Sequence, residues 1–161
     1  MKLALMGLAV VVIAYSIFAY YHKWSKSYSQ TVGNIKAENI WKVWTDINNW
    51  GTWQNDIEYA KLEGEFKAGN VFILKPKGVP EVKIALIEVE ENKLFTDLTK
   101  FPLAKMYGRH EFIQHGNELE IKTTMSVEGY LGFIWRKIVA EDVANGMEEQ
   151  TKSLIKKVRD G

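Results

Sequence analysis

The sequence predicts an α+β fold in which a curved antiparallel β-sheet wraps around one long C-terminal helix. Two short helices and an N-terminal transmembrane helix complete the prediction. Three observations lead to it: an uncharged apolar run at residues 3–21, short segments divided by turn residues at 57–127, and one continuous helical pattern at 130–158. These are the sequence signatures of a membrane helix, an antiparallel meander and an amphipathic helix.

The run LALMGLAVVVIAYSIFAYY at residues 3–21 is long enough to span a bilayer, because about 20 apolar residues cross its hydrocarbon core. Tyr20, Tyr21 and Trp24 would then form an interfacial aromatic belt. The competing interpretation is a cleaved secretory signal, whose apolar region is usually about 7–15 residues long and ends at a small-residue site before a polar start. We therefore favour an uncleaved single-pass anchor at residues 1–22.

The positive charges flanking this run set the expected orientation. Lys2 lies on one side, and Lys23 and Lys26 lie on the other, so the positive-inside rule favours a cytoplasmic domain. Residues 23–26 are expected to be a juxtamembrane linker, and residues 27–161 the folded domain.

Composition excludes several classes of function. The 21 Lys and Arg against 20 Asp and Glu do not predict a nucleic-acid surface. With no cysteine, the chain has neither disulfides nor thiolate metal sites nor cysteine nucleophiles. His22, His110 and His115 have no spacing typical of metal ligands, and no glycine-rich phosphate loop is present. We expect no metal and no cofactor.

The domain is expected to begin with a strand at 28–32 and a helix at 35–45, followed by a helical turn that directs Trp50 and Trp53 inward. Alternation and turn residues then predict five or six strands, with 118–127 showing the clearest alternation of apolar and polar residues. The candidates are 57–62, 71–75, 82–90, 94–100, 105–114 and 118–127.

The C-terminal segment 130–158 is expected to cover the concave face of the sheet with one apolar stripe. The stripe consists of Phe133, Ile134, Ile138, Val139, Val143, Met147, Leu154, Ile155 and Val158. A sheet bent around one helix is a helix grip, and its curved and straight surfaces commonly leave an internal cavity. Gly146 inside the helix could admit a ligand or a close strand, although ordinary packing explains it equally well.

Several local strings resemble the START-like helix-grip superfamily, specifically the polyketide cyclase/dehydrase and lipid-transport type also called SRPBCC. They are VWTDINNWGTW at residues 43–53, GEFKAGNVFILKPKG at 64–78, and YGRHEF at 107–112 followed by GNELEIKTTMSV. The resemblance covers residues 27–158. It implies a cavity for an apolar or amphipathic small molecule, and only some members catalyse a reaction there. No catalytic motif of the family transfers to this chain.

The first functional hypothesis is a membrane-tethered binding protein for a hydrophobic small molecule or lipid. Aromatic and methionine side chains with few polar groups are typical of such a pocket. The expected wall residues are Trp50, Trp53, Phe72, Leu74, Met106, His110, Phe112, Thr123, Met125 and Met147.

The alternative is a polyketide cyclase or dehydratase in which His110 acts as acid or base, because a buried imidazole can hold or move a proton. Alternation places His110 on the apolar face, but it does not settle whether Asp97, Thr96 or Leu98 points inward. A histidine satisfied within the core and a non-catalytic structural domain at the membrane remain open. The sequence does not distinguish an enzyme from a binding protein.

Overall fold

The computed structural model describes residues 2–21 and 23–161, and for 2–4 and 19–21 it describes the backbone alone. Seven antiparallel strands form one sheet in the order β1-β7-β6-β5-β4-β3-β2. Their bounds are β1 (Trp24–Gly33), β2 (Ile57–Leu62), β3 (Val71–Pro76), β4 (Val82–Glu90), β5 (Leu94–Phe101), β6 (Ala104–His115) and β7 (Glu118–Glu128).

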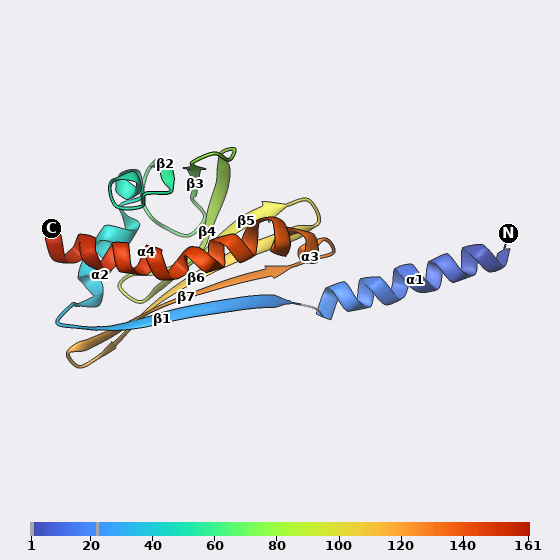
Figure 1. The fold of residues 1–161 in the computed structure, drawn as a ribbon, viewed down its shortest axis with the longest axis horizontal. Coiled ribbons are helices and arrows are strands. Elements are labelled where there is room, and N and C mark those ends of the chain that lie inside the picture. The colour runs from blue at the N-terminus through green and yellow to red at the C-terminus, as the bar shows by residue number, and fades with distance from the viewer. Residues whose placement is uncertain (1, 22) are drawn as a thin grey trace.

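Helices lie against one face of this sheet. Helix α2 (Ala37–Thr45) and the 3₁₀ helix η1 (Ile47–Thr52) cover one end, and the C-terminal helix runs lengthwise over the strands (Figure 1). The predicted α+β helix grip is therefore confirmed for the sheet, the two short helices and the long C-terminal helix.

The C-terminal helix contains a π-helical turn. It consists of α3 (Gly132–Trp135), the π-helix η2 (Arg136–Ala140) and α4 (Glu141–Asp160). The wider π-turn accommodates one extra residue, which rotates the preceding segment about the helix axis. An apolar stripe predicted with one constant helical period therefore assigns the wrong residues to the buried face in this region. The predicted stripe residues Phe133, Ile138 and Val143 are exposed.

The side chains that α4 and η2 bury are Ala140, Ala144, Met147, Thr151, Leu154 and Ile155. Three of these, Met147, Leu154 and Ile155, belong to the predicted stripe. Gly146 faces the open side of α4, where a Cβ would meet nothing within 4 Å. No strand approaches this glycine closely.

The interior divides into two apolar clusters. The aromatic cluster lies under α2 and η1 and includes Trp44, Trp50, Phe72 and Phe95. The methionine cluster lies toward the other end of the sheet and consists of Met106, Met125, Val127, Ala140, Ala144 and Met147. Along β7 the two clusters are separated by Thr123, which is 1% exposed.

Strand β1 begins at Trp24, ahead of the Tyr28 start expected from the sequence. It pairs with β7 along its whole length, from Trp24 opposite Val127 to Gly33 opposite Glu118. Residues 24–26, expected to be a linker, are therefore part of the sheet.

Helix α1 (Lys2–Tyr21) projects from the end of the domain (Figure 1). The predicted transmembrane anchor is wrong, because no helix within the described residues is long and apolar enough to cross a membrane. A span needs about 20 consecutive apolar residues. The described side chains of α1 cover only residues 5–18, and among them the Tyr15 hydroxyl donates a hydrogen bond to the Tyr130 carbonyl oxygen at 2.8 Å.

The predicted single-pass membrane location and the orientation inferred from the lysines are wrong for the same reason. The side chains of Tyr20 and Tyr21, expected in the aromatic belt, and His22 lie outside the described residues.

Candidate functional site

A group of polar side chains lies on the inner face of the three central strands. His110 on β6 contacts Asp97 on β5, with 3.2 Å between Nε2 and Oδ2, and Thr123 on β7, with 3.1 Å between Nδ1 and Oγ1. The His110 side chain is 8% exposed and that of Asp97 is 14% exposed. We call these three residues the polar belt. His110 on β6 and Thr123 on β7 lie between the two apolar clusters, and Asp97 on β5 contacts His110.

Strand register and one glycine explain how Asp97 reaches His110. Asp97 is paired with Gly108, two residues before His110 on β6. A Cβ at Gly108 would lie 2.8 Å from Asp97 Oδ2, so only glycine lets the carboxylate lie across β6 at this point. Gly108 on the inner face is the sequence signal that would have oriented Asp97 inward.

The hydrogen bonds select one tautomer of the neutral imidazole. A carboxylate only accepts hydrogen bonds, so His110 Nε2–H donates to Asp97. Nδ1 of the neutral ring then accepts from the Thr123 hydroxyl. Both ring nitrogens are occupied by protein groups, and Asp97 and Thr123 orient the ring from opposite sides.

Aromatic rings enclose His110. The Phe95 ring stacks on the imidazole with 4.4 Å between centroids and a 27° interplanar angle. The Trp44 ring lies at 4.7 Å and 56°. The aromatic cluster therefore surrounds one of the few polar groups inside the domain.

The residues predicted from sequence to line one cavity fall into three groups. Trp50, Trp53, Phe72 and Phe112 are buried in the aromatic cluster, and Leu74 packs against it half-buried. Met106, Met125 and Met147 belong to the methionine cluster. Thr123 and His110 lie in the polar belt. The structure thus brings these residues to the same interior but not to a single wall.

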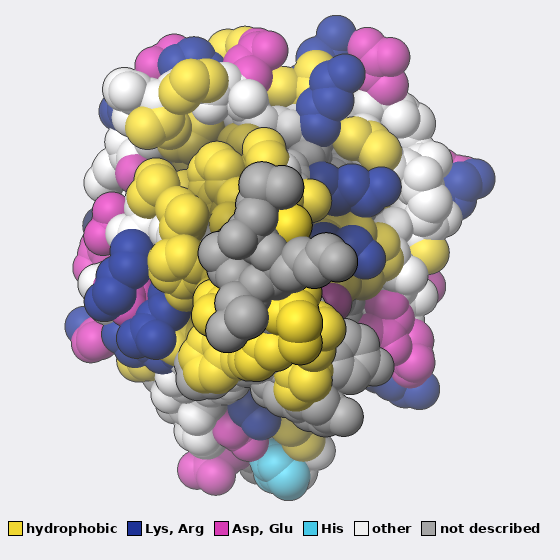
Figure 2. All heavy atoms as spheres, turned by 90° about the vertical axis from the view of Figure 1, so that its right-hand side faces the viewer, with side chains coloured by type: hydrophobic (Ala, Val, Ile, Leu, Met, Phe, Trp, Pro, Cys, Tyr) yellow, Lys and Arg dark blue, Asp and Glu magenta, His cyan; other side chains and the backbone are white. Residues whose placement is uncertain are grey.

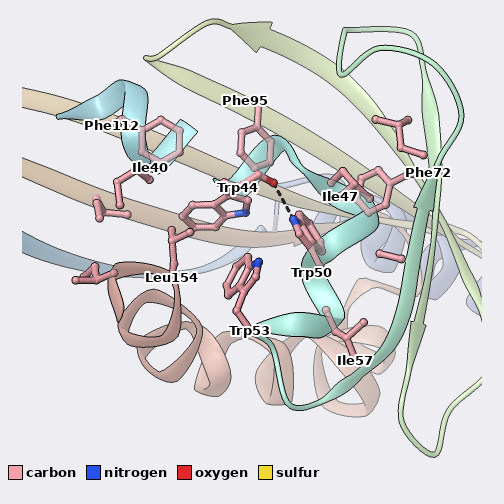
Figure 3. Packing of buried hydrophobic residues seen from close by; sticks show 14 of the residues in the cluster. Ile40, Trp44, Ile47, Trp50, Trp53, Ile57, Phe72, Phe95, Phe112 and Leu154 are labelled. Carbon is pink, nitrogen blue, oxygen red and sulfur yellow. Dashed lines mark hydrogen bonds between the residues drawn. The ribbon is translucent and has the colours of Figure 1, made fainter. Parts of the chain in front are cut away.

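Sequence reasoning missed a set of hydrogen-bond donors in the aromatic cluster. Trp44 Nε1, Trp53 Nε1 and Gln54 Nε2 are buried, and no described residue supplies an acceptor to them. Trp50 Nε1, by contrast, donates to the Trp44 carbonyl oxygen at 2.7 Å. Figure 3 shows Trp44, Trp50 and Trp53 gathered between α2, η1 and Leu154 of α4, with the Nε1 edges of Trp44 and Trp53 turned toward Trp50.

The unpartnered donors are connected through Trp50. The Trp50 and Trp53 rings lie 6.4 Å apart, and the Trp50 carbonyl oxygen accepts from the Gln54 backbone N–H at 2.9 Å. The Gln54 side-chain oxygen accepts from Gln150 Nε2 on α4 at 3.0 Å, which leaves its own NH₂ group without a partner among the described residues.

Two pockets open on the surface at opposite ends of the sheet. One, of about 760 Å³, lies between α1 and the β5–β6 turn, and the other, of about 580 Å³, lies beside Asn34 and Asn117. In the described part of the chain, no three His, Asp or Glu side chains gather as a metal site requires.

The fold matches solved structures over most of their length. Ara h 8.0201 matches with a TM-score of 0.70 and 13% identity, over 87% of this chain and 100% of that chain. Norcoclaurine synthase from Thalictrum flavum matches with a TM-score of 0.65 and 14% identity, over 90% of this chain and 92% of that chain. A START superfamily protein from Mycobacterium smegmatis matches with a TM-score of 0.62 and 18% identity, over 86% and 98%.

No protein-family model and no curated protein sequence matches the chain. The structural matches confirm the resemblance to the START-like helix-grip superfamily at the level of the fold. At these identities the roles of individual residues do not transfer.

Proposed function

We propose that this protein binds a hydrophobic small molecule, a lipid included, inside the domain at residues 27–161, between the sheet and α4. The ligand is apolar over most of its surface and carries an oxygen that accepts hydrogen bonds. The helix-grip fold supports this proposal. One structure of norcoclaurine synthase, a protein of the same fold, is a complex with dopamine and hydroxybenzaldehyde, aromatic molecules that both carry oxygen.

The observation that carries the proposal is the set of unpartnered donors around Trp50. A buried donor without an acceptor costs about 1–3 kcal/mol, so a folded protein rarely retains several in one place without a reason. Trp44 Nε1, Trp53 Nε1 and Gln54 Nε2 would all gain an acceptor from a carbonyl or hydroxyl oxygen placed among them.

The methionine cluster supplies an adaptable apolar wall in this proposal. Methionine side chains are unbranched and polarisable, so Met106, Met125 and Met147 can repack around ligands of different shape. The polar belt separates this wall from the unpartnered donors, which suits a molecule with an apolar body and one polar end.

The geometry favours binding over acid–base catalysis. Asp97 and Thr123 contact the two ring nitrogens of His110, so a substrate would have to displace the Thr123 hydroxyl from Nδ1 before exchanging a proton there. We therefore assign His110 a positioning role: it fixes the Thr123 hydroxyl and the Asp97 carboxylate inside the domain.

The test compares two neutral ligands of nearly equal size, acetonaphthone and ethylnaphthalene, of which only the first carries a carbonyl oxygen. Both are titrated against the full chain loaded with N-phenylnaphthylamine, a neutral fluorescent probe. We expect acetonaphthone to displace the probe about three to ten times more tightly, the value of one net hydrogen bond. Trp53→Phe, which removes one unpartnered donor, should reduce that preference.

Two variants on α4 locate the binding. Met147 is 2% exposed and Val143, about one turn earlier, is 42% exposed. Met147→Trp should abolish probe binding by filling the interior, whereas Val143→Trp should leave it unchanged. If Met147→Trp does not fold, Met125→Phe serves the same purpose. Equal binding of the probe to all of these variants would refute an interior site.

A further inference from the structure

The turn between β5 and β6 carries an exposed leucine in a strained conformation. Leu103 has φ 54° and its side chain is 66% exposed. Proline followed by a residue with positive φ is the pattern of a type II turn, whose second central position strongly prefers glycine or asparagine. Leucine there costs on the order of 1–2 kcal/mol. The Leu103 carbonyl oxygen accepts from the Leu131 backbone N–H at 3.1 Å, which glycine at position 103 would also allow. A large apolar side chain kept exposed at a strained position points to a role in binding.

Leu103 lies on the wall of the pocket of about 760 Å³ beside α1. Phe101, Ala104 and Tyr130 contribute further apolar surface, and the pocket size is ordinary for a small-molecule site. Figure 2 views the molecule along α1, whose hydrophobic side chains project toward the viewer, and shows Lys or Arg side chains beside the hydrophobic ones.

Lysines surround the apolar wall. Lys23, Lys100 and Lys105 line the pocket with a single carboxylate, Glu128, which Lys23 already contacts at 2.8 Å. Lys100 and Lys105 are directly opposite each other on β5 and β6, an arrangement of like charges that destabilises a sheet. No described carboxylate lies within ion-pair distance of either lysine, although Lys105 is also opposite Glu128 on β7 and its charge helps to lower the Glu128 pKa.

We propose that this pocket binds an anionic amphiphile. Its acidic group lies between Lys100 and Lys105, where it relieves their repulsion, and its hydrocarbon chain lies against Leu103 and Tyr130. The strained leucine and the opposed lysines both lower the stability of the empty domain, and one ligand of this class compensates both. The site is separate from the interior one and does not rest on it.

The probe is decanesulfonate, titrated calorimetrically below its micelle concentration into the full chain. Two partial probes separate its features: methanesulfonate carries the charge without the chain, and decyl maltoside carries the chain without the charge. We expect one equivalent of decanesulfonate to bind at least tenfold more tightly than either partial probe. Equal affinity for methanesulfonate would mean a simple anion site, and equal affinity for decyl maltoside a simple apolar site. Either result overturns the proposal.

Leu103→Gly gives a readout that a purely structural role cannot produce. The variant should raise the melting temperature, because glycine removes the strain, and should weaken decanesulfonate binding at least fivefold. Asn92→Gly is the matched control, since Asn92 also has positive φ, at 59°, but lies in the β4–β5 turn. It should leave binding unchanged.

Lys100→Gln and Lys105→Gln should each weaken decanesulfonate binding several-fold, while Lys83→Gln on neighbouring β4 should not. Unchanged affinity in Leu103→Gly or in both lysine variants would overturn the proposal. So would decanesulfonate binding that Met147→Trp abolishes, because the ligand would then occupy the interior. That result would leave the proposed function standing.

Discussion

Replacing Gly108 by alanine places one methyl group beneath the Asp97 carboxylate. The new Cβ would lie 2.8 Å from Oδ2 and 3.0 Å from Oδ1, both shorter than an ordinary contact. The carboxylate must move by several tenths of an ångström. Its contact with His110 Nε2 is already 3.2 Å, so such a movement takes it beyond hydrogen-bonding distance.

The expected cost follows from two opposing effects. Losing a hydrogen bond to a charged group inside the domain costs about 1.5–3 kcal/mol. Alanine in place of glycine within a strand returns about 0.5–1 kcal/mol. Gly108→Ala should therefore lower the free energy of unfolding by about 1–2 kcal/mol.

Urea denaturation followed by tryptophan fluorescence measures this cost in two backgrounds. In Asp97→Ala there is no carboxylate to displace, so alanine at position 108 should be neutral or slightly stabilising. The double-mutant cycle should give a coupling energy of about 2 kcal/mol. An equal cost in both backgrounds, within about 0.5 kcal/mol, would show that Asp97 does not lie over Gly108.

Three further predictions concern other elements. Trp50→Phe leaves the buried Trp44 carbonyl oxygen without its 2.7 Å donor, and should lower the free energy of unfolding by about 1–3 kcal/mol in urea denaturation. The hydrogen bond from Lys23, opposed by partial burial, holds the pKa of Glu128 below its usual range. Glu128→Gln should therefore lower the melting temperature near neutral pH, where the carboxylate is ionised, and have progressively less effect below about pH 4, as Glu128 becomes protonated. Deleting Ile138 should convert the π-turn into α-helix. The domain should still fold, as circular dichroism would show, because α3 and α4 would keep the same faces toward the sheet.

Each of these predictions has a control. Trp135→Phe removes an exposed indole hydrogen bond, to Pro102, and should cost far less than Trp50→Phe. Glu63→Gln removes the carboxylate of a fully exposed ion pair with Lys61, and its effect on melting should be small at every pH. Deleting Val143 instead of Ile138 shifts the register of α4 and should unfold the domain. Equal tolerance of the two deletions would contradict the role given to the π-turn.

Strand β7 was predictable because its pattern is local. Leu119, Ile121 and Val127 alternate with polar residues, and a slip of one position would bury charges. The expected strand at 118–127 matches Glu118–Glu128. The π-turn was not predictable in this way, because its residues, RKIVA, are equally compatible with an α-helix and nothing in them marks the extra residue. Ala140 and Ala144, which it turns inward, are too small to mark an apolar stripe.

The candidate site depended on information that one strand alone does not contain. The inward direction of Asp97 follows from its pairing with Gly108 on another strand. The predicted wall residues are also spread along the strands: Met106 and Phe112 share a face of β6 but are six residues apart, about 20 Å along a strand. Alternation assigns a face, whereas the position along that face requires the whole sheet.

The full-length pairing of β1 with β7 also determines how the domain responds to force. Tension applied along α1 would enter the sheet through β1, and the C-terminus lies at the opposite end of the molecule (Figure 1). A pull along the strand loads the backbone hydrogen bonds between β1 and β7 in shear, so these bonds share the force and must break together. Tension perpendicular to the strand would break the same hydrogen bonds one after another. The domain should therefore resist pulling from its two ends more strongly than pulling across the sheet.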